Sequence, residues 1–265
     1  MLFALIMSVM MLNLGCESSS NSRQEEHPLT QTEEKQQKLS SLNIKEQAAD
    51  IALPFCEHKN CIEIHIQTIQ TQEQWMNDWI SKNQANVIQG LIGLKQNMTL
   101  QQAVNAFIKQ SDVWQTEDES HVAYELTMFT RMAYQRRQFV LLKLSVDVKQ
   151  QLMHEKELDY FFVADRKQKK TLSLPAIINK NQQVELNDIV QKAYQEWLTK
   201  QAEDIQQQAP KKLSWRQADW FFDQEGIALH YRNNEIVNQA KGLDIYLTKL
   251  QTQKVLNAEI YSQMF

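Results

Sequence analysis

The sequence predicts an α+β fold, a largely antiparallel sheet packed against one long helix, with a smaller N-terminal region of one strand and helices. Two periodicities lead to this prediction. Between residues 121 and 165, apolar residues recur at every second position, which is typical of half-buried strands. Between residues 186 and 198 they recur with the period of an amphipathic helix. A chain of 265 residues with 43% apolar content can form one large domain or two small ones.

The first element is an uncharged, apolar stretch, residues 1–15, which is too short to span a bilayer as a mature helix. It ends in Leu14-Gly15-Cys16, where a small residue precedes a cysteine as in a bacterial lipobox. We expect a lipoprotein signal peptide over 1–15 and acyl chains such as palmitate on Cys16, which would anchor the protein to a membrane. An ordinary secretory signal or a buried N-terminal helix is the alternative, since Asn13 is atypical. Glu17, in place of the Asp that retains many lipoproteins at the inner membrane, favours the outer membrane of the periplasm.

The next segment, residues 16–47, is rich in Ser, Gln, Glu and Lys and has few apolar residues. Such a composition cannot bury enough surface to fold alone, so the segment is predicted to be a disordered tether.

Two further cysteines, Cys56 and Cys61, lie close together in "CEHKNC". In an exported protein such a pair favours a disulfide bond. A metal site that uses His58 and His65 is the alternative, but the spacing is not a standard zinc pattern. No metal is therefore expected.

Residues 48–118 are predicted to hold one strand and two helices. "CIEIHIQTIQ" alternates, so His65 falls on the polar face of the strand. Capping boxes are expected at Thr71 with Gln74 and at Thr99 with Gln102, each before a helical pattern.

Residues 119–265 supply the main sheet and the long helix. Alternation predicts strands within 121–132, 139–148 and 158–165, followed by an exposed charged turn, "DRKQKK". The long helix is predicted over 186–208 and ends before Pro210. "WFFDQEGIALHYR" predicts a hairpin with Gly226 in its turn, and a last strand and a short terminal helix follow.

Several of these segments carry short motifs that follow one another in a characteristic order. A strand ends in Asp165 before a charged turn and a Leu-x-Leu motif, and a helix follows. After the helix come an aromatic strand, a Gly-x-x-Leu-x-Tyr strand, "NEI" and Ala-x-Gly. The motif residues are Leu172, Leu174, Gly226, Leu229, Tyr231, Asn234, Glu235, Ile236, Ala240 and Gly242.

This order of motifs resembles the C-terminal extracytoplasmic domain of RsiV-type anti-sigma factors. The same domain also occurs in peptidoglycan-deacetylase-associated proteins and in Gram-negative lipoproteins of unknown function. The resemblance covers roughly residues 120–260 and implies an RsiV-like α+β domain over 119–265. It implies binding, because the best-understood relatives bind lysozyme directly with this domain. Many members carry a Gly-Ala-His-Gly loop where this chain has "QQLMHEKE", so that His154 stands at the histidine position without the glycines.

The composition and motifs limit the function. With a net charge of −4 the chain does not resemble a nucleic-acid binder, which would carry a basic patch and a high pI. No familiar catalytic motif is found, so no catalytic residue and no cofactor are predicted. The lipobox predicts a lipid-anchored periplasmic protein, and the resemblance implies a binding module for lysozyme or a peptidoglycan-related ligand, with Met153 and His154 in a candidate binding loop. The alternatives are a cryptic peptidoglycan hydrolase that uses Asp219, Asp223 or Glu225, and a structural envelope scaffold.

Overall fold

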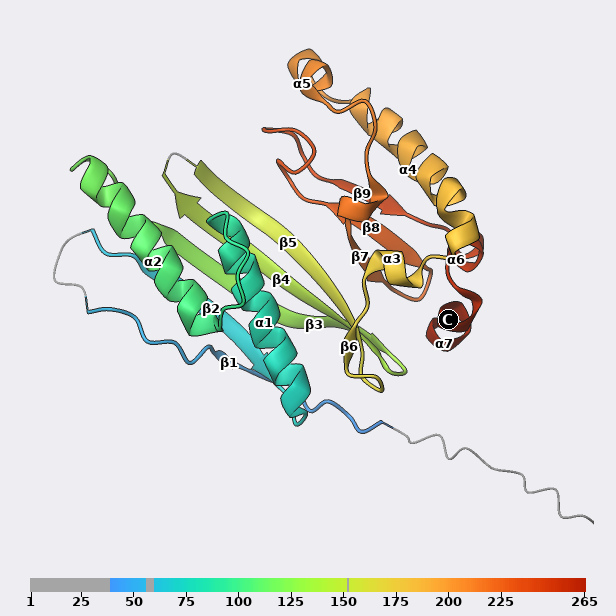
Figure 1. Cartoon of the computed structure of the whole chain (residues 1–265), viewed down its shortest axis with the longest axis horizontal. Helices are drawn as coiled ribbons and strands as arrows, with labels where there is room; N and C mark the ends of the chain where they lie inside the picture. The colour runs from blue at the N-terminus through green and yellow to red at the C-terminus, as the bar shows by residue number, and fades with distance from the viewer. Residues whose placement is uncertain (1–38, 56–59, 152) are drawn as a thin grey trace, which may run out of the picture. The chain divides into compact units, whose positions relative to one another are not determined.

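Six strands form one sheet and lie in it in chain order (Figure 1). The computed structural model describes residues 39–55, 60–151 and 153–265, which belong to one compact unit. Neighbouring strands are antiparallel except for the parallel pair β2 and β3. The strands are β1 (Lys45–Ala48), β2 (Glu63–Gln70), β3 (Glu125–Arg136), β4 (Phe139–Gln150), β5 (Met153–Asp165) and β6 (Lys170–Thr171).

Two helices, α1 (Gln74–Leu91) and α2 (Leu100–Glu117), cover one face of this sheet (Figure 1). The capping box at Thr99 and Gln102 is confirmed. The one predicted at Thr71 and Gln74 is wrong, because α1 begins after Glu73 and has no side-chain cap. The Thr71 hydroxyl instead accepts from the Glu73 backbone N–H at 3.1 Å.

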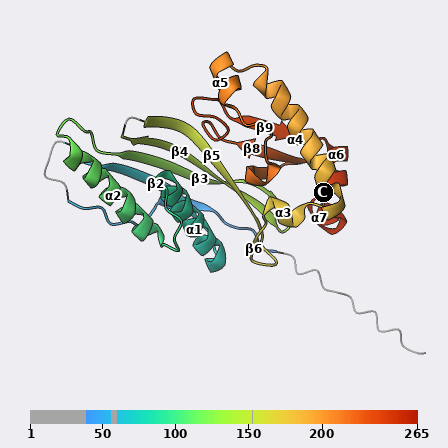
Figure 2. The same ribbon diagram turned by 45° about the horizontal axis from the view of Figure 1, so that its top comes forward.

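The other face carries a second layer, built from a three-stranded antiparallel sheet and helices (Figure 2). This sheet contains β7 (Asp219–Phe222), β8 (Ile227–Tyr231) and β9 (Leu243–Tyr246). The helices are α3 (Leu174–Ile177), η1 (Lys180–Gln182), α4 (Gln183–Leu198), α5 (Glu203–Gln208), η2 (Trp215–Gln217), α6 (Lys249–Val255) and α7 (Ala258–Met264). The predicted α+β class, with a mostly antiparallel sheet, is confirmed.

Strand β4 separates two apolar cores. Phe139 and Leu141 point into the core beside α4 and the small sheet. Val140, Leu142 and Leu144 point into the core beneath α1 and α2. The two-residue period of a strand is what sends alternate side chains to opposite faces, so one strand supports both layers.

Three boundaries differ from the sequence-based expectations. Lys45–Ala48 form the edge strand β1, although the polar segment 16–47 was predicted to be tether. The boundary placed between residues 118 and 119 falls within one continuous sheet, since β2 pairs with β3. The helix predicted over 186–208 is two helices, α4 and α5, because the apolar stripe ends at Leu198.

Candidate functional site

A cavity of about 250 Å³ lies where the β4–β5 hairpin meets the loop that follows β8. Apolar and polar side chains line it together. The apolar lining residues are Leu91, Val148, Met153, Leu158 and Tyr160, and the polar ones are Gln150, Glu155, Arg232, Asn233, Asn234 and Glu235. An apolar cavity with a few convergent polar groups is the usual form of a ligand site.

The predicted binding loop is in fact the end of this hairpin. β5 begins at Met153, and Met153, His154 and Glu155 pair with the end of β4. Tertiary pairing with β4 extends the strand through a polar stretch that shows no alternation. Met153 is 48% exposed and lines the cavity, whereas His154 is exposed and is not among the lining residues.

The hairpin keeps left-handed backbone conformations without glycine. Gln151 has φ 51° and Glu157 has φ 55°, values that side-chain-bearing residues seldom adopt. These two residues lie within "QQLMHEKE", the stretch where the resemblance leads one to expect a glycine-rich loop. The backbone geometry that glycine favours is therefore present here with other residues.

Arg232 organises the polar side of the cavity. Its guanidinium donates to Asp219 at 2.5 Å and to Glu235 at 2.9 Å. It also lies over the Tyr160 ring, with Cζ 4.4 Å from the centroid, in a cation–π arrangement. The Glu235 carboxylate in turn accepts from the Arg232 backbone N–H at 2.8 Å, so the loop after β8 is closed by its own side chains.

His230 joins the two sheets beside this network. Its Nδ1 lies 2.6 Å from the Asp244 carboxylate on β9, and its Nε2 lies 3.1 Å from the Asp159 carbonyl on β5. Both partners can only accept, so both contacts are hydrogen bonds only when the imidazole carries two protons. Asp159 also accepts from Ser145 at 2.7 Å and pairs with Lys143 on β4.

Burial shifts the acid–base properties of this cluster. It raises the pKa of Asp219 and of Glu235, and the nearby Arg232 guanidinium opposes that rise in both. Burial also raises the pKa of Tyr160 and of Tyr231. Perturbed groups beside a cavity are a common mark of function, although ion-pair networks that serve only structure produce them too.

The three carboxylates predicted for a hydrolase are not all brought together: Asp223 and Glu225 line one cavity of about 50 Å³, and Asp219 is not among its lining residues. Asp219 stands at the start of β7 and pairs with Arg232. Asp223 lies beyond the other end of that strand, where it accepts from the backbone N–H groups of Glu225 and Gly226 at 2.7 and 3.1 Å. Asp223 therefore shapes the hairpin turn, as Asp often does.

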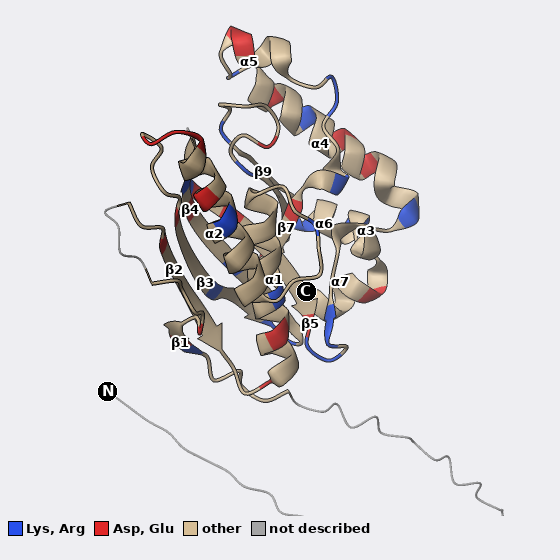
Figure 3. Ribbon diagram, turned by 60° about the vertical axis from the view of Figure 1, so that its left-hand side comes forward, with Lys and Arg blue, Asp and Glu red and all other residues tan. Residues whose placement is uncertain are grey.

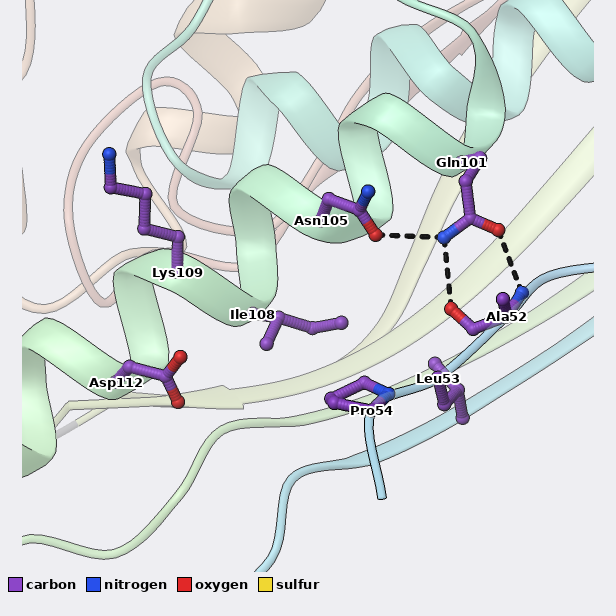
Figure 4. Close-up of a pocket in the computed structure, with 8 residues that line it drawn as sticks. All are labelled: Ala52, Leu53, Pro54, Gln101, Asn105, Ile108, Lys109 and Asp112. Carbon is purple, nitrogen blue, oxygen red and sulfur yellow. Dashed lines mark hydrogen bonds between the residues drawn. The ribbon is translucent and has the colours of Figure 1, made fainter. Parts of the chain in front are cut away.

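A second cavity, of about 500 Å³, lies between residues 52–54 and α2 (Figure 4). Gln101 joins its walls, because its side-chain amide accepts from the Ala52 N–H at 2.7 Å and donates to the Ala52 carbonyl at 2.9 Å. Leu53 and Ile108 contribute apolar surface. Asn105, Lys109 and Asp112 add polar groups along α2, and the cavity is a shallow groove.

The cysteine predictions lie partly outside the described residues. The signal peptide, Cys16 and Cys56 are not among them, so lipidation and the disulfide with Cys61 stay predictions. Within residues 39–55, 60–151 and 153–265, no group of His, Cys, Asp and Glu side chains is placed to hold a metal ion. Over that same part of the chain, none of the helices combines the length and the apolar character needed to cross a bilayer.

Two solved structures share this fold. One is a DUF3298 family protein from Pseudomonas aeruginosa PAO1, with 16% identity and a TM-score of 0.61 over 84% of this chain and 97% of that one. The other is a member of the DUF3298 family from Bacteroides fragilis NCTC 9343, with 11% identity and a TM-score of 0.57 over the same shares. No family model matches the sequence, and no curated protein matches it significantly. The fold is therefore that of DUF3298 proteins, and at these identities the likeness extends no further.

Sequence reasoning located Met153 but missed the rest of the cavity. Asn234 and Glu235 belong to the "NEI" motif, which by itself predicts no site, and no sequence motif marks Arg232. The signal available was the short spacing of Arg232, Asn233, Asn234 and Glu235, four polar residues in succession directly after an apolar strand. Their partners Tyr160 and Asp219 come from other strands, which no local pattern reveals.

Proposed function

We propose that this chain is a binding module of the bacterial envelope that captures a protein such as lysozyme, or a peptidoglycan-related ligand, at the cavity beneath the β4–β5 hairpin. One observation carries the proposal. Met153, which belongs to the loop that the resemblance to the RsiV-type domain pointed to, lines the cavity together with the Arg232–Glu235 pair. The lining thus unites a flexible thioether, apolar surface and partly exposed charges, which are the ingredients of a recognition site.

The charge of the molecule favours a basic partner only weakly. The net charge is −4, which gives little long-range steering. In the view of Figure 3, acidic and basic residues both occur along α2 and α4. Recognition would therefore depend on local contacts at the cavity rather than on long-range electrostatic attraction by the whole molecule.

The hydrolase alternative has less support. Asp219 lies at the opposite end of β7 from Asp223 and Glu225, and both Asp219 and Asp223 are engaged in structural contacts. Asp223→Asn and Glu225→Gln variants of a binder should keep their ligand, whereas a hydrolase that relied on these acids would lose its activity.

The first test is calorimetry of residues 17–265 titrated with a c-type lysozyme. Binding at micromolar affinity or better supports the sensor or inhibitor role. Absence of heat, together with separate elution on a sizing column, would remove lysozyme as the partner. The same titration with peptidoglycan fragments then distinguishes a wall ligand from a scaffold that binds neither.

We also propose that Cys16 carries the lipid and that the module is held at the outer membrane, facing the periplasm. The support is the Leu14-Gly15-Cys16 sequence and Glu17 after it. Labelling with radioactive palmitate should mark the wild-type protein and not a Cys16→Ser variant. Density-gradient fractionation of the cell envelope then reports the membrane, and label retained by Cys16→Ser would contradict the assignment.

A further inference from the structure

We infer that the cavity beneath the β4–β5 hairpin receives a single basic side chain, preferably arginine, presented by a protein partner. The inference deepens the proposed function by naming what enters the site. It depends on the balance of acceptors and donors in the cavity, on its size and on its apolar lining.

The cavity has unused capacity to accept hydrogen bonds. The carboxylate of Glu155 makes no hydrogen bond or ion pair with the described residues, although Glu155 lines the cavity. Gln150 Oε1 is buried without a donor, while its amide nitrogen donates to the Leu91 carbonyl at 2.9 Å. A buried acceptor without a partner costs stability, which a ligand carrying donors would recover.

Arg232, the cation among the lining residues, already has carboxylate partners. Arg232 donates to Asp219 and to Glu235, and its face lies against Tyr160. Glu155 adds a carboxylate with no matching cation, so the lining residues and Asp219 together hold three acids against one base. The charge complementary to this set is positive.

The apolar part of the lining suits the methylene stem of a basic side chain. Val148 and Leu158 are 3% and 8% exposed, and Met153 stands at the mouth with 48% exposure. Lys and Arg bury their stems along such surfaces while the charged head finds polar partners. The guanidinium of arginine has five donors in a plane, which matches several separated acceptors better than a lysine ammonium does.

Size selects a side chain over a wall fragment. Sites for drug-sized ligands occupy roughly 300–1,000 Å³. A cavity of about 250 Å³ is smaller than that range and suits one side chain rather than a disaccharide unit.

The test compares two small probes of nearly equal shape, of which one carries a guanidinium and the other a neutral group with a carbonyl oxygen in place of one nitrogen. N-acetyl-arginine methylamide and its uncharged citrulline counterpart are titrated into ¹⁵N-labelled residues 17–265, and amide shifts are followed by NMR. We expect the arginine probe to shift amides of 153–158 and 232–235, and the citrulline probe to bind at least roughly tenfold more weakly. Equal binding of both probes, or shifts confined to other segments, would overturn the inference, as would a disaccharide-peptide fragment binding there in place of the arginine probe.

Two variants and a control complete the design. Glu155→Gln keeps the shape and removes the charge, so affinity for the arginine probe should fall roughly tenfold. Glu155→Lys supplies a competing cation and should abolish binding. Glu119→Gln, at an exposed carboxylate in the turn after α2, should leave affinity unchanged. Unchanged affinity in Glu155→Gln would contradict the assignment of the cavity.

The same variants separate this inference from the proposed function. If lysozyme binds and Glu155→Lys does not weaken it, the cavity is not its docking site, although the binding role stands. If lysozyme does not bind while the arginine probe does, the cavity assignment stands and lysozyme is removed as the partner.

Discussion

Arg166 carries a charged side chain that the fold buries completely. Its side chain has no exposed surface, and it forms an ion pair with Glu73 and donates to the Ser40 carbonyl at 2.8 Å. Its Nε and Nη1 have no partner. The charged turn "DRKQKK", predicted to be exposed, thus contains a buried cation that ties the N-terminal segment and the start of α1 to the end of β5. Sequence alone gave no sign of this, because Glu73 is 93 positions away.

For the Arg166–Glu73 ion pair we predict that replacing one partner costs more stability than replacing the other. Glu73→Gln leaves a buried guanidinium without its carboxylate and should destabilise the fold by about 3–5 kcal/mol. Arg166→Met removes the buried charge itself and keeps an apolar side chain, so it should cost clearly less. Urea unfolding of both variants gives the two free energies, and a larger loss in Arg166→Met would show that the pair is not limited by desolvation.

The acids beside Arg232 predict a specific dependence on pH. Burial raises the pKa of Asp219 and Glu235 above the unfolded values of about 3.9 and 4.3. The folded state therefore binds their protons more tightly than the unfolded state does. Their contribution to stability is complete below the unfolded pKa and is lost as pH rises through the folded pKa.

Urea unfolding between pH 4 and pH 7 tests this sign. The free energy of unfolding of the wild type minus that of Asp219→Asn should fall as pH rises, because the amide does not titrate. Glu235→Gln should behave in the same direction. A difference that grows with pH would mean that the Arg232 ion pair outweighs burial.

At the scale of elements, the glycines of the shared motif have steric causes. A Cβ at Gly226 would lie 2.5 Å from Thr252 Oγ1 and 2.7 Å from the Leu247 carbonyl oxygen. A Cβ at Gly242 would lie 2.5 Å from the Tyr231 carbonyl oxygen. Both positions allow close backbone approach around β8, which only glycine permits.

Gly226 and Gly90 form a matched pair for a test. Gly90 lies within α1 and has no atom within 4 Å of an added Cβ, so Gly90→Ala should stabilise by about 0.5–1 kcal/mol. Gly226→Ala should destabilise, because a backbone carbonyl cannot move aside as a flexible side chain can. Thermal unfolding gives both signs, and a neutral Gly226→Ala would show that the β7–β8 turn and α6 can separate at little cost.

The elements show which features local pattern can predict. The alternation of apolar residues in β4 and the apolar stripe of α4 were predictable, because the spacing of apolar residues follows the faces that pack against a core. The start of β5 and the edge strand β1 were not, since polar residues form these strands only by pairing with a neighbour. The Arg232 cluster was hidden for the same reason, because His230 and Asp159 meet across 71 positions.

At the scale of the whole molecule, β4 links the two cores into one structure. Five of its residues face the core beneath α1 and α2, and each is at most 3% exposed: Val140, Leu142, Leu144, Val146 and Val148. Covering each is worth roughly 1.5–3 kcal/mol, which together rivals the ~5–15 kcal/mol of a typical domain. Residues 119–265 therefore depend on the segment before them, although sequence patterns favoured a boundary there.

This dependence gives a prediction about truncation. Residues 39–265 should unfold in one cooperative transition and elute from a sizing column as a single species without aggregates. Residues 119–265 alone lack α1, α2 and the parallel partner of β3, so they expose a continuous apolar face and an unpaired strand edge. We expect this fragment to bind a hydrophobic dye strongly and to elute as aggregates. Cooperative unfolding of a dye-free monomer of 119–265 would contradict the prediction, because it would show that the core beside α4 can support β3, β4 and β5 without the helices that cover their other face.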